Sequence, residues 1–316
     1  MLNPVLVTGA SGFVGNCVVR RLLQQGHQVQ VLLRPEARLW RLRGLLERLV
    51  VWRADLCAAA AVRAAVTAAQ PQVVLHLATY GAYETQADAR RILETNVLGS
   101  YNLFEASLAA QARLIVNTGS SSEYGYRDEA MRESDLLLPN SVYAVAKAAQ
   151  THLCGLLAKA GDCAMATFRL FSVYGPWEEP ARLLPTVIRR ARAGLPLEMV
   201  SPETARDFVY IEDVLDALLD FERLAGVHGA VYNLGSGVQS TMRDVVAAVQ
   251  AAVGRQSEVR WGGMKARKWD TARWQADIAK ARMELGWSPK YTLADGVARM
   301  AAWMKEVGDD YPHGQG

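Results

Sequence analysis

The stretch Val5-Leu-Val-Thr-Gly-Ala-Ser-Gly-Phe-Val-Gly15 joins a short apolar run to a helical pattern that continues from Asn16 to Gln25. Its glycines follow the spacing G-x-x-G-x-x-G. In such a loop, glycines allow a tight turn, a close approach of the backbone to a phosphate, and close packing of the helix on the strand. The positive end of the helix then favours a pyrophosphate. A purely structural turn is the alternative. The stretch predicts a dinucleotide site formed by Gly9, Ser11, Gly12, Phe13, Val14 and Gly15.

Strand-like and helix-like segments alternate throughout the first half of the chain. Because each apolar run is followed by a helical pattern, the order predicts a parallel, doubly wound sheet of the α/β class with right-handed connections. Such a Rossmann-type sheet binds its ligands at the carboxyl ends of the strands. The expected strands are 5–8, 28–33, 50–55, 73–77, 114–117 and 164–170, and the expected helices are 16–25, 58–69, 91–109 and 141–159.

The second half of the chain has a different character. Prolines interrupt it at several points, helical patterns lie near 183–193, 213–224 and 240–253, and no second glycine fingerprint follows. We expect a smaller α/β lobe that closes over the site and selects the substrate. The predicted domains are a dinucleotide-binding domain of residues 1–175, with a return segment near 207–237, and a substrate-binding lobe of residues 176–206 and 238–316.

Composition excludes several classes of protein. The net charge of +3 is too small to indicate nucleic-acid binding, and the apolar runs are too short for a membrane span. The chain begins with a strand pattern rather than a signal peptide. Its four cysteines show neither CxxC nor metal-ligand spacing, so we expect no metal site and buried free thiols. These features favour the cytoplasm.

The end of the second expected strand predicts the type of cofactor. At this position an acidic residue accepts a hydrogen bond from the ribose of NAD, whereas an arginine accommodates the 2′-phosphate of NADP. Arg34 follows the strand directly, and no acidic residue occurs before Glu36. We therefore expect NADP(H) rather than NAD(H). Arg38, Arg41 and Arg43 follow further along the chain. The alternative to a phosphate-binding role for them is that they form the solvated face of a helix whose apolar face carries leucines.

Other cofactor contacts are expected where the remaining strands end. Asp55 ends the third expected strand and is positioned to accept from the adenine amino group. Ala78 and Thr79 follow the fourth strand at its carboxyl end. The full set of expected contacts beyond the glycine loop is Arg34, Asp55, Leu56, Leu77, Ala78, Thr79, Asn96, Thr118, Tyr143 and Lys147.

Tyr143 and Lys147 are four residues apart in a segment, 141–159, that is rich in helix formers. They therefore lie on one face of a helix, one turn from each other. A phenol with its ordinary pKa of about 10 is a poor base at neutral pH, but a nearby ammonium stabilises the phenolate. The pair fits proton transfer in an alcohol–ketone couple. On spacing alone, an unreactive surface pair is the alternative.

Several motifs in this order resemble the extended short-chain dehydrogenases/reductases, and more narrowly the nucleotide-sugar epimerase, dehydratase and 4-ketoreductase branch. The resemblance runs from about residue 5 to residue 300. Its combination of motifs is specific for the family and much less specific for the reaction. The matching segments are Gly9–Gly15, Ser120–Gly125, Tyr143 with Lys147, Arg206–Asp213, Val231–Ser236, Trp274–Asp277 and Leu285–Trp287.

The resemblance implies roles for individual residues. Tyr143 would be the acid/base, and Lys147 would bind the nicotinamide ribose and lower the pKa of Tyr143. Ser120 would hydrogen-bond the oxygen of the substrate, with a polar turn as the alternative. Ser121 and Ser122 stand where the 4,6-dehydratases carry an Asp-Glu pair, and Glu123 comes one position late, on the opposite side of a strand-like run. Dehydration is therefore disfavoured, because a hydroxyl cannot replace that acid/base pair near neutral pH.

What remains is hydride transfer at a sugar carbon without elimination. We expect NADPH-dependent reduction of a nucleotide-linked 4-keto-6-deoxyhexose, with 4-epimerisation through a transient ketone as the alternative. A non-catalytic NADP-binding relative is a third possibility. The resemblance also implies that Arg206 and Arg267 bind the diphosphate of a nucleotide sugar, beside the substrate contacts Ser120, Ser121, Ser122 and Tyr143. For Arg206, surface pairing with an aspartate is the alternative. A homodimer formed through helices 91–109 and 141–159 is expected.

Overall fold

The computed structural model describes residues 2–263, 273–308 and 311. The chain divides into two compact units. The first comprises Met1–Gly125, Glu133–Leu170 and Leu215–Tyr232, and the second comprises Tyr126–Arg132, Phe171–Val214 and Asn233–Gly316. The first unit thus has segments that end at Gly125 and Leu170, followed by a return segment, Leu215–Tyr232. The short segment 126–132 between them belongs to the second unit.

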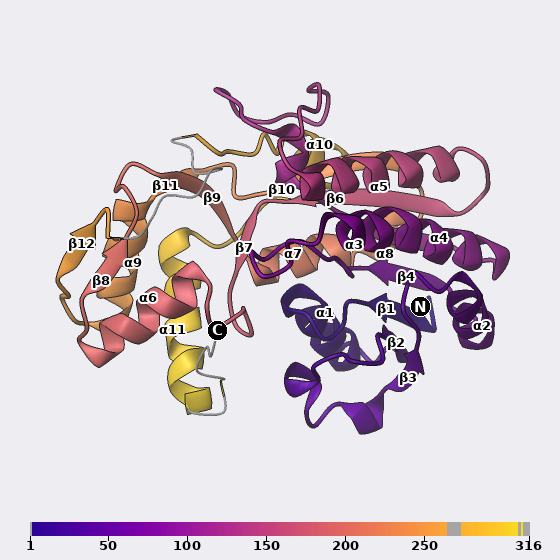
Figure 1. The fold of residues 1–316 in the computed structure, drawn as a ribbon, viewed down its shortest axis with the longest axis horizontal. Helices are drawn as coiled ribbons and strands as arrows, with labels where there is room; N and C mark the ends of the chain where they lie inside the picture. Colours follow the sequence, from indigo (N-terminus) through magenta and orange to yellow (C-terminus); the bar gives the residue numbers. More distant parts are fainter. Residues whose placement is uncertain (1, 264–272, 309–310, 312–316) are drawn as a thin grey trace. The chain divides into compact units, whose positions relative to one another are not determined.

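A seven-stranded sheet with the strand order β10-β6-β5-β4-β1-β2-β3 forms the centre of the first unit (Figure 1). Neighbouring strands from β3 to β6 pair in parallel. This order confirms the predicted doubly wound sheet. The strands are β1 (Val5–Thr8), β2 (Val29–Leu33), β3 (Val50–Arg53), β4 (Val73–His76), β5 (Leu114–Ser120), β6 (Ala164–Leu170) and β10 (His228–Leu234).

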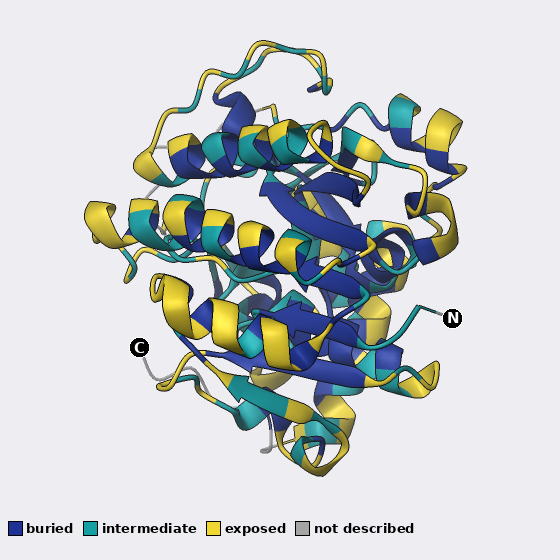
Figure 2. Ribbon diagram, turned by 90° about the vertical axis from the view of Figure 1, so that its right-hand side faces the viewer, coloured by how far each residue is buried: buried dark blue, intermediate teal, exposed yellow. Residues whose placement is uncertain are grey.

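Helices cover both faces of this sheet, which is why β1 and β4 are apolar and completely buried. One face packs against α2 (Ala59–Ala69), α4 (Gly99–Ala109) and α5 (Val142–Ala158). On the other face, α1 (Phe13–Gln24) lies beside α7 (Ile211–Leu218) and α8 (Phe221–Leu224). Figure 2 shows the buried strands between helices whose outward sides are exposed. Arg21 of α1 pairs with Asp216 of α7 (3.2 Å), and the ring of His27, in the loop after α1, lies 5.6 Å from the ring of Phe221 in α8.

The strand order reverses between β1 and β4, because the chain continues from β1 to β2 on one side and from β4 to β5 on the other. The loops that follow β1 and β4 meet at this point. A Cβ on Gly9 would lie 2.5 Å from the carbonyl carbon of Leu77, and Gly9 has a φ of +68°. Only glycine fits there. The switch point of a doubly wound sheet is where such folds bind ligands.

The described part of the second unit contains two smaller sheets and the helices that pack on them. One sheet has the order β11-β9-β7 and the other pairs β12 with β8. Asp207 on β9 connects this unit internally, because its buried carboxylate accepts hydrogen bonds from the backbone N–H groups of Ser236, Gly237 and Ala276. The elements are β7 (Ser172–Tyr174), α6 (Leu183–Ala193), β8 (Leu197–Met199), β9 (Ala205–Tyr210), β11 (Gln239–Thr241), α9 (Met242–Val253), β12 (Val259–Trp261), α10 (Ala279–Leu285) and α11 (Leu293–Val307).

The structure differs from the sequence-based interpretation at three places. The leucine-rich segment after β2, where a helix with a solvated basic face was the alternative, forms two short 3₁₀ turns, Trp40–Leu42 and Leu46–Arg48. The expected helix 91–109 is interrupted: α3 (Ala89–Leu93) runs into a π-helical turn, Glu94–Leu98, before α4 begins. Cys57 is exposed, whereas Cys17, Cys154 and Cys163 are buried as expected. No helix in the described part of the chain has the length and hydropathy needed to cross a bilayer.

Candidate active site

Helix α5 carries the predicted pair Tyr143 and Lys147. It begins after Ser141, whose hydroxyl accepts a hydrogen bond from the backbone N–H of Ala144 (3.1 Å) and so caps the helix. The loop that follows β4 passes against the ring of Tyr143, because a Cβ on Gly81 would lie 3.2 Å from the Cδ2 atom of that ring. Tyr143 therefore lies beside the loop that follows β4.

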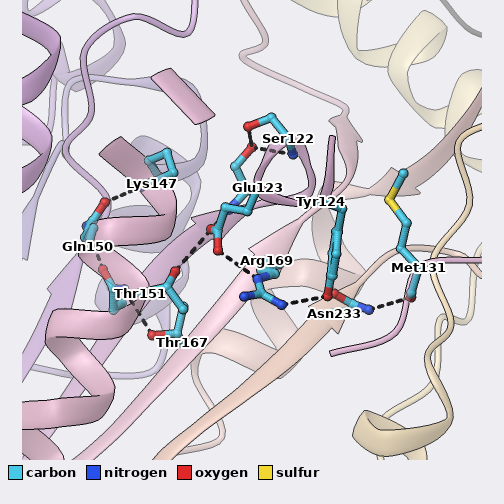
Figure 3. Close-up of polar contacts among 12 residues, drawn as sticks. Ser122, Glu123, Tyr124, Met131, Lys147, Gln150, Thr151, Thr167, Arg169 and Asn233 are labelled. Atoms are coloured by element: carbon cyan, nitrogen blue, oxygen red, sulfur yellow. Dashed lines mark hydrogen bonds and ion pairs between the residues drawn. The ribbon is translucent and has the colours of Figure 1, made fainter. Parts of the chain in front are cut away.

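The ammonium of Lys147 is buried beside the carboxyl-terminal part of β5, with 1% of the residue exposed. It donates to the carbonyl of Thr118 (2.5 Å) and to the side-chain oxygen of Gln150 (2.6 Å). The amide of Gln150 donates to Asn117 (2.7 Å), whose own amide donates to the Thr167 hydroxyl (3.0 Å). Because the NH2 group of Gln150 is bonded to Asn117, the side-chain oxygen of Gln150 points to Lys147. Figure 3 shows Lys147 and Gln150 in this arrangement.

Burial lowers the pKa of Lys147 to about 8, and the negative charge of Glu123 acts in the opposite direction. The shift is what a desolvated ammonium is expected to show. His76 lies on the neighbouring strand β4, and its pKa falls to about 3 because it is buried and close to the Lys147 charge. His76 is therefore neutral, and its ring nitrogens are hydrogen-bonded to Thr8 (2.8 Å) and Ser100 (2.9 Å).

Ser120 is the last residue of β5 and caps the 3₁₀-helix Ser121–Tyr124. Its hydroxyl accepts from the backbone N–H of Ser122 (3.2 Å) and lies 2.8 Å from the Ser122 hydroxyl. The expectation of a strand-like run was wrong. Glu123 does turn away from the neighbouring serines, but it does so because the helical turn directs its carboxylate into the interior. Ser121 is buried, and Ser122 is half-buried.

Asn96 lies in the π-helical turn and is buried. Its side-chain oxygen accepts from the backbone N–H of Tyr80 (2.9 Å) and the hydroxyl of Thr79 (3.2 Å), and its amide donates to the Tyr80 carbonyl (2.7 Å). Asn96 therefore fixes the loop after β4, which includes two expected cofactor contacts, Ala78 and Thr79. Turns of this kind often occur at functional sites.

The glycine loop fits a dinucleotide. A Cβ on Gly15 would collide with Gly9, which shows how closely α1 packs on the loop. At Gly12, by contrast, the nearest atom to a Cβ is the Gly9 oxygen at 3.2 Å, so a phosphate has room to approach the backbone. Helix α1 begins at Phe13, directly after this glycine, and its first N–H groups point toward that space.

The residues expected around the adenosine half differ in their surroundings. Arg34 is exposed at the end of β2, and its carbonyl accepts from Arg53 (3.0 Å). Asp55 accepts from the backbone N–H of Cys57 (2.9 Å), and Leu56 packs where a Cβ on Gly99 would lie. Arg41, for which a solvated helix face was the alternative, is buried and donates to the carbonyl of Ser11 in the glycine loop (3.4 Å).

The expected diphosphate-binding residues belong to the second unit. Arg206 lies on β9 with its guanidinium 5.7 Å from the centre of the Trp274 ring, and it donates to the carbonyl of Ala205 (2.9 Å). The carboxylate of the next residue, Asp207, accepts from the backbone N–H groups of Ser236 and Gly237 and from the Ser236 hydroxyl. Arg267 lies outside the described residues.

Comparison with known proteins agrees with this geometry. The family model for the NAD dependent epimerase/dehydratase family matches residues 5–235. The chain belongs to this family. A UDP-glucose 4-epimerase of Mycolicibacterium smegmatis is 30% identical, over 95% of this chain and 98% of that protein. A dTDP-glucose 4,6-dehydratase of Neisseria gonorrhoeae is 27% identical, over 95% and 94%. The structure of MoeE5 with UDP-glucuronic acid and NAD has a TM-score of 0.82 and 30% identity, covering 96% and 99%.

Two site features of this family member were missed in the sequence. Gln150 follows Lys147 by three residues, a spacing that places both on one helix face. Glu123 follows Ser120 by three residues, and the pattern Ser-x-x-Glu is the signature of a capping box. Both signals were present, but neither indicates by itself that the residues are buried beneath the site.

Substituting Lys147 by Met tests the buried charge. Between pH 8 and 10.5 the unfolded chain still holds the lysine proton, whereas the folded protein has lost it. The stability of the wild type should therefore rise with pH in this window, relative to Lys147→Met, by up to about 3 kcal/mol. Urea unfolding of the apoproteins measures this difference. Lys159→Met, at the exposed end of α5, is the control. The difference in free energy of unfolding between the wild type and Lys159→Met should not change with pH in this window. A difference that is constant with pH would contradict a lowered pKa.

Proposed function

We propose that this protein transfers hydride at C4 of a nucleotide sugar and does not eliminate water from it. The buried ammonium of Lys147, one turn from Tyr143 and bonded to the strand that ends in Ser120, is the observation that carries the proposal. The nucleotide-sugar epimerases and dehydratases among the relatives support the substrate class.

In this proposal each residue has a distinct task. When bound, the nicotinamide supplies the hydride chemistry. Tyr143 holds the proton that is exchanged with the C4 oxygen, and Ser120 hydrogen-bonds that oxygen and orients it. Lys147 stabilises the phenolate form of Tyr143 through its positive charge. Two N–H groups of Lys147 are engaged with Thr118 and Gln150, so the third is available to a ribose hydroxyl.

The serines after Ser120 argue against dehydration. Ser121 is buried, Ser122 is bonded to Ser120, and the carboxylate of Glu123 is bonded to Arg169 and Thr151. No acidic side chain of the segment 120–125 is therefore placed to remove a proton from a sugar. This supports chemistry at C4 alone, although dehydratases occur among the relatives.

Reduction of a 4-keto-6-deoxyhexose is the first candidate reaction, and 4-epimerisation is the second, supported by the 30% identical UDP-glucose 4-epimerase. The two differ in their stoichiometry. A reductase oxidises one NADPH for each sugar, whereas an epimerase interconverts two sugars without net oxidation of the cofactor. Loss of reduced-nicotinamide absorbance with a nucleotide 4-keto-6-deoxyhexose detects the reductase. Chromatographic separation of UDP-glucose from its C4 epimer detects the epimerase.

The surface of the protein supports a homodimer formed through α4 and α5. These helices and the turn before α4 expose large apolar side chains, which water solvates poorly. A second copy packing on the same helices would bury them, as the expected four-helix interface requires. The residues are Leu98, Tyr101, Val145 and Leu156.

Replacing Tyr143 by Phe removes the proton donor while the ring is kept. We expect turnover to fall by about a hundredfold or more, the usual effect of losing a positioned acid/base. The melting temperature and cofactor affinity should change little. Tyr101→Phe makes the same chemical change on the exposed side of α4 and should have no effect. Wild-type turnover in Tyr143→Phe would refute the proposed chemistry.

We propose NADP(H) as the preferred cofactor, with Arg34 binding the 2′-phosphate, although MoeE5 was solved with NAD. Arg34 and Arg53 place two guanidinium groups where β2 and β3 end. Arg34→Ala should weaken NADPH much more than NADH, by about 1.5–3 kcal/mol for a charge-assisted hydrogen bond. Arg43→Ala, also exposed, is the control. Calorimetry with both cofactors decides the matter, and equal affinities in the wild type would exclude the preference.

We propose further that Arg206 binds the diphosphate of the substrate, because a planar guanidinium grips phosphate oxygens in two places. Arg206→Ala should raise the KM for a nucleotide sugar about tenfold or more, which corresponds to roughly 1.4 kcal/mol. Cofactor affinity should not change. Arg243→Ala, which removes an exposed arginine paired with Glu203 in the same unit, is the matched control. Titrations with UDP, GDP, dTDP and NADPH separate the two effects. An equal loss of affinity for all of them would contradict this role.

A further inference from the structure

Beneath Ser120 lies a carboxylate that the reaction described above does not use. Glu123 is completely buried, and its two oxygens are engaged on both sides. One oxygen accepts from the backbone N–H of Ser120 (2.7 Å) and from the Thr151 hydroxyl (3.1 Å). The other accepts from Arg169 on β6 (2.8 Å), which is itself buried. A buried ion pair of this kind is expensive to desolvate, so its presence calls for an explanation beyond stability.

The position of Arg169 is fixed from two further directions. It donates to the hydroxyl of Tyr124 (2.9 Å), and its guanidinium lies 4.6 Å from the centre of the Tyr124 ring. In the sheet register Arg169 is the partner of Gly119, the residue before Ser120. A Cβ on Gly119 would lie 2.6 Å from the Glu123 carboxylate, so only glycine leaves room for this group. Figure 3 shows Glu123 between Thr151 and Arg169.

This anchoring determines where the Ser120 hydroxyl lies. Ser120 and Glu123 form a capping box, in which Glu123 holds the backbone of Ser120 while the hydroxyl accepts from the next turn. The hydroxyl proton is then directed either to Ser122 or to a ligand. Without the carboxylate, the backbone N–H of Ser120 would lose its partner and the short 3₁₀ turn would lose its support.

The same carboxylate lies on the side of α5 that carries the buried ammonium, because Thr151, which bonds Glu123, follows Lys147 by one helical turn. Its charge opposes the effect of burial on the pKa of Lys147. The other titratable groups around Lys147 are His76 on β4, which is neutral, and Tyr143 one turn away on α5. Arg169 faces Glu123 from β6. Among these groups Glu123 is the one that carries a negative charge.

We propose that Glu123 is a positioning residue for the reaction: its carboxylate holds Ser120 in place and supplies the negative charge that accompanies Lys147. The proposal rests on the functions proposed for Ser120 and Lys147. Glu123 touches neither substrate nor cofactor in this scheme, and Arg169 anchors it.

Two variants separate the two roles. Glu123→Gln keeps an oxygen for the Ser120 N–H but removes the charge. In the double variant Glu123→Val with Thr151→Glu, the carboxylate moves to the position on α5 whose hydroxyl bonds Glu123 in the wild type, and the Glu123 acceptor for the Ser120 N–H is lost. The double exchange roughly conserves volume, which favours folding. Glu105→Gln, in an exposed ion pair with Arg63, is the control for the chemical change.

The titration of Lys147 provides a measurement that does not depend on activity. The chain has few lysines. In protein labelled at the lysine Cε, the Lys147 signal is therefore identified by its absence in Lys147→Met. We expect its pKa to be lower in Glu123→Gln than in the wild type, and to recover in the double variant. It should not change in Glu105→Gln.

Kinetic measurements test whether Glu123 positions Ser120. We expect kcat to fall about ten- to a hundredfold in the double variant, the scale of a misplaced reacting group, while KM and cofactor affinity change much less. Wild-type kcat in the double variant would overturn the positioning of Ser120. An unchanged Lys147 titration in folded Glu123→Gln would overturn the charge role. If the wild type turns over no nucleotide sugar, the proposed function fails, and the titration still decides the electrostatic part.

Discussion

The buried ammonium of Lys147 is the constraint on which the arrangement of the first unit depends. A cation removed from water must be compensated by fixed dipoles or by an opposite charge. Thr118 and Gln150 supply the dipoles, and Asn117 and Thr167 hold Gln150 in the required orientation. Because these residues come from α5, β5 and β6, the ammonium ties the helix to the two strands at the edge where the site forms. Burial of the Lys147 ammonium lowers stability, but it holds the positive charge at a fixed position.

The sheet provides the second requirement, which is that loops from distant parts of the chain meet. The strand order reverses at β1 and β4, so the loops after these strands separate from their neighbours and face each other. Gly9 allows contact with Leu77, Asn96 fastens the loop that follows, and Gly81 brings that loop against Tyr143. The expected cofactor contacts and the proposed acid/base, Tyr143, are therefore connected through backbone geometry rather than through long flexible side chains.

The sequence predicted those parts of the fold and site that depend on local patterns. The strand β6 was expected at its observed bounds, and α5 to within a residue at each end, because periodicity and the Ser141 cap act over short distances. The segment after β2 was predicted wrongly, since its leucines also fit a helical period, and the structure places Arg41 against the glycine loop. The π-helical turn around Asn96 has no sequence signature of its own. Pairings such as Arg169 with Glu123 join residues far apart in the chain, and no local pattern encodes them.

Glu123 in the first unit and Asp207 in the second are buried carboxylates that hold a loop by accepting from backbone N–H, but the two differ in charge compensation. Glu123 has Arg169 as a cationic partner, whereas the hydrogen-bond donors to Asp207 are neutral: Ser236, Gly237 and Ala276. Burial accordingly raises the pKa of Asp207, with the hydrogen bonds opposing that shift. A carboxylate whose pKa is raised lowers stability once it ionises, and protonation removes that penalty. Asp207 thus keeps its loop in place at a cost in stability near neutral pH. Glu123 instead pairs with the buried guanidinium of Arg169, and its charge opposes the effect of burial on the pKa of Lys147. The first unit therefore places an ion-paired carboxylate on the side of α5 that carries its second buried cation.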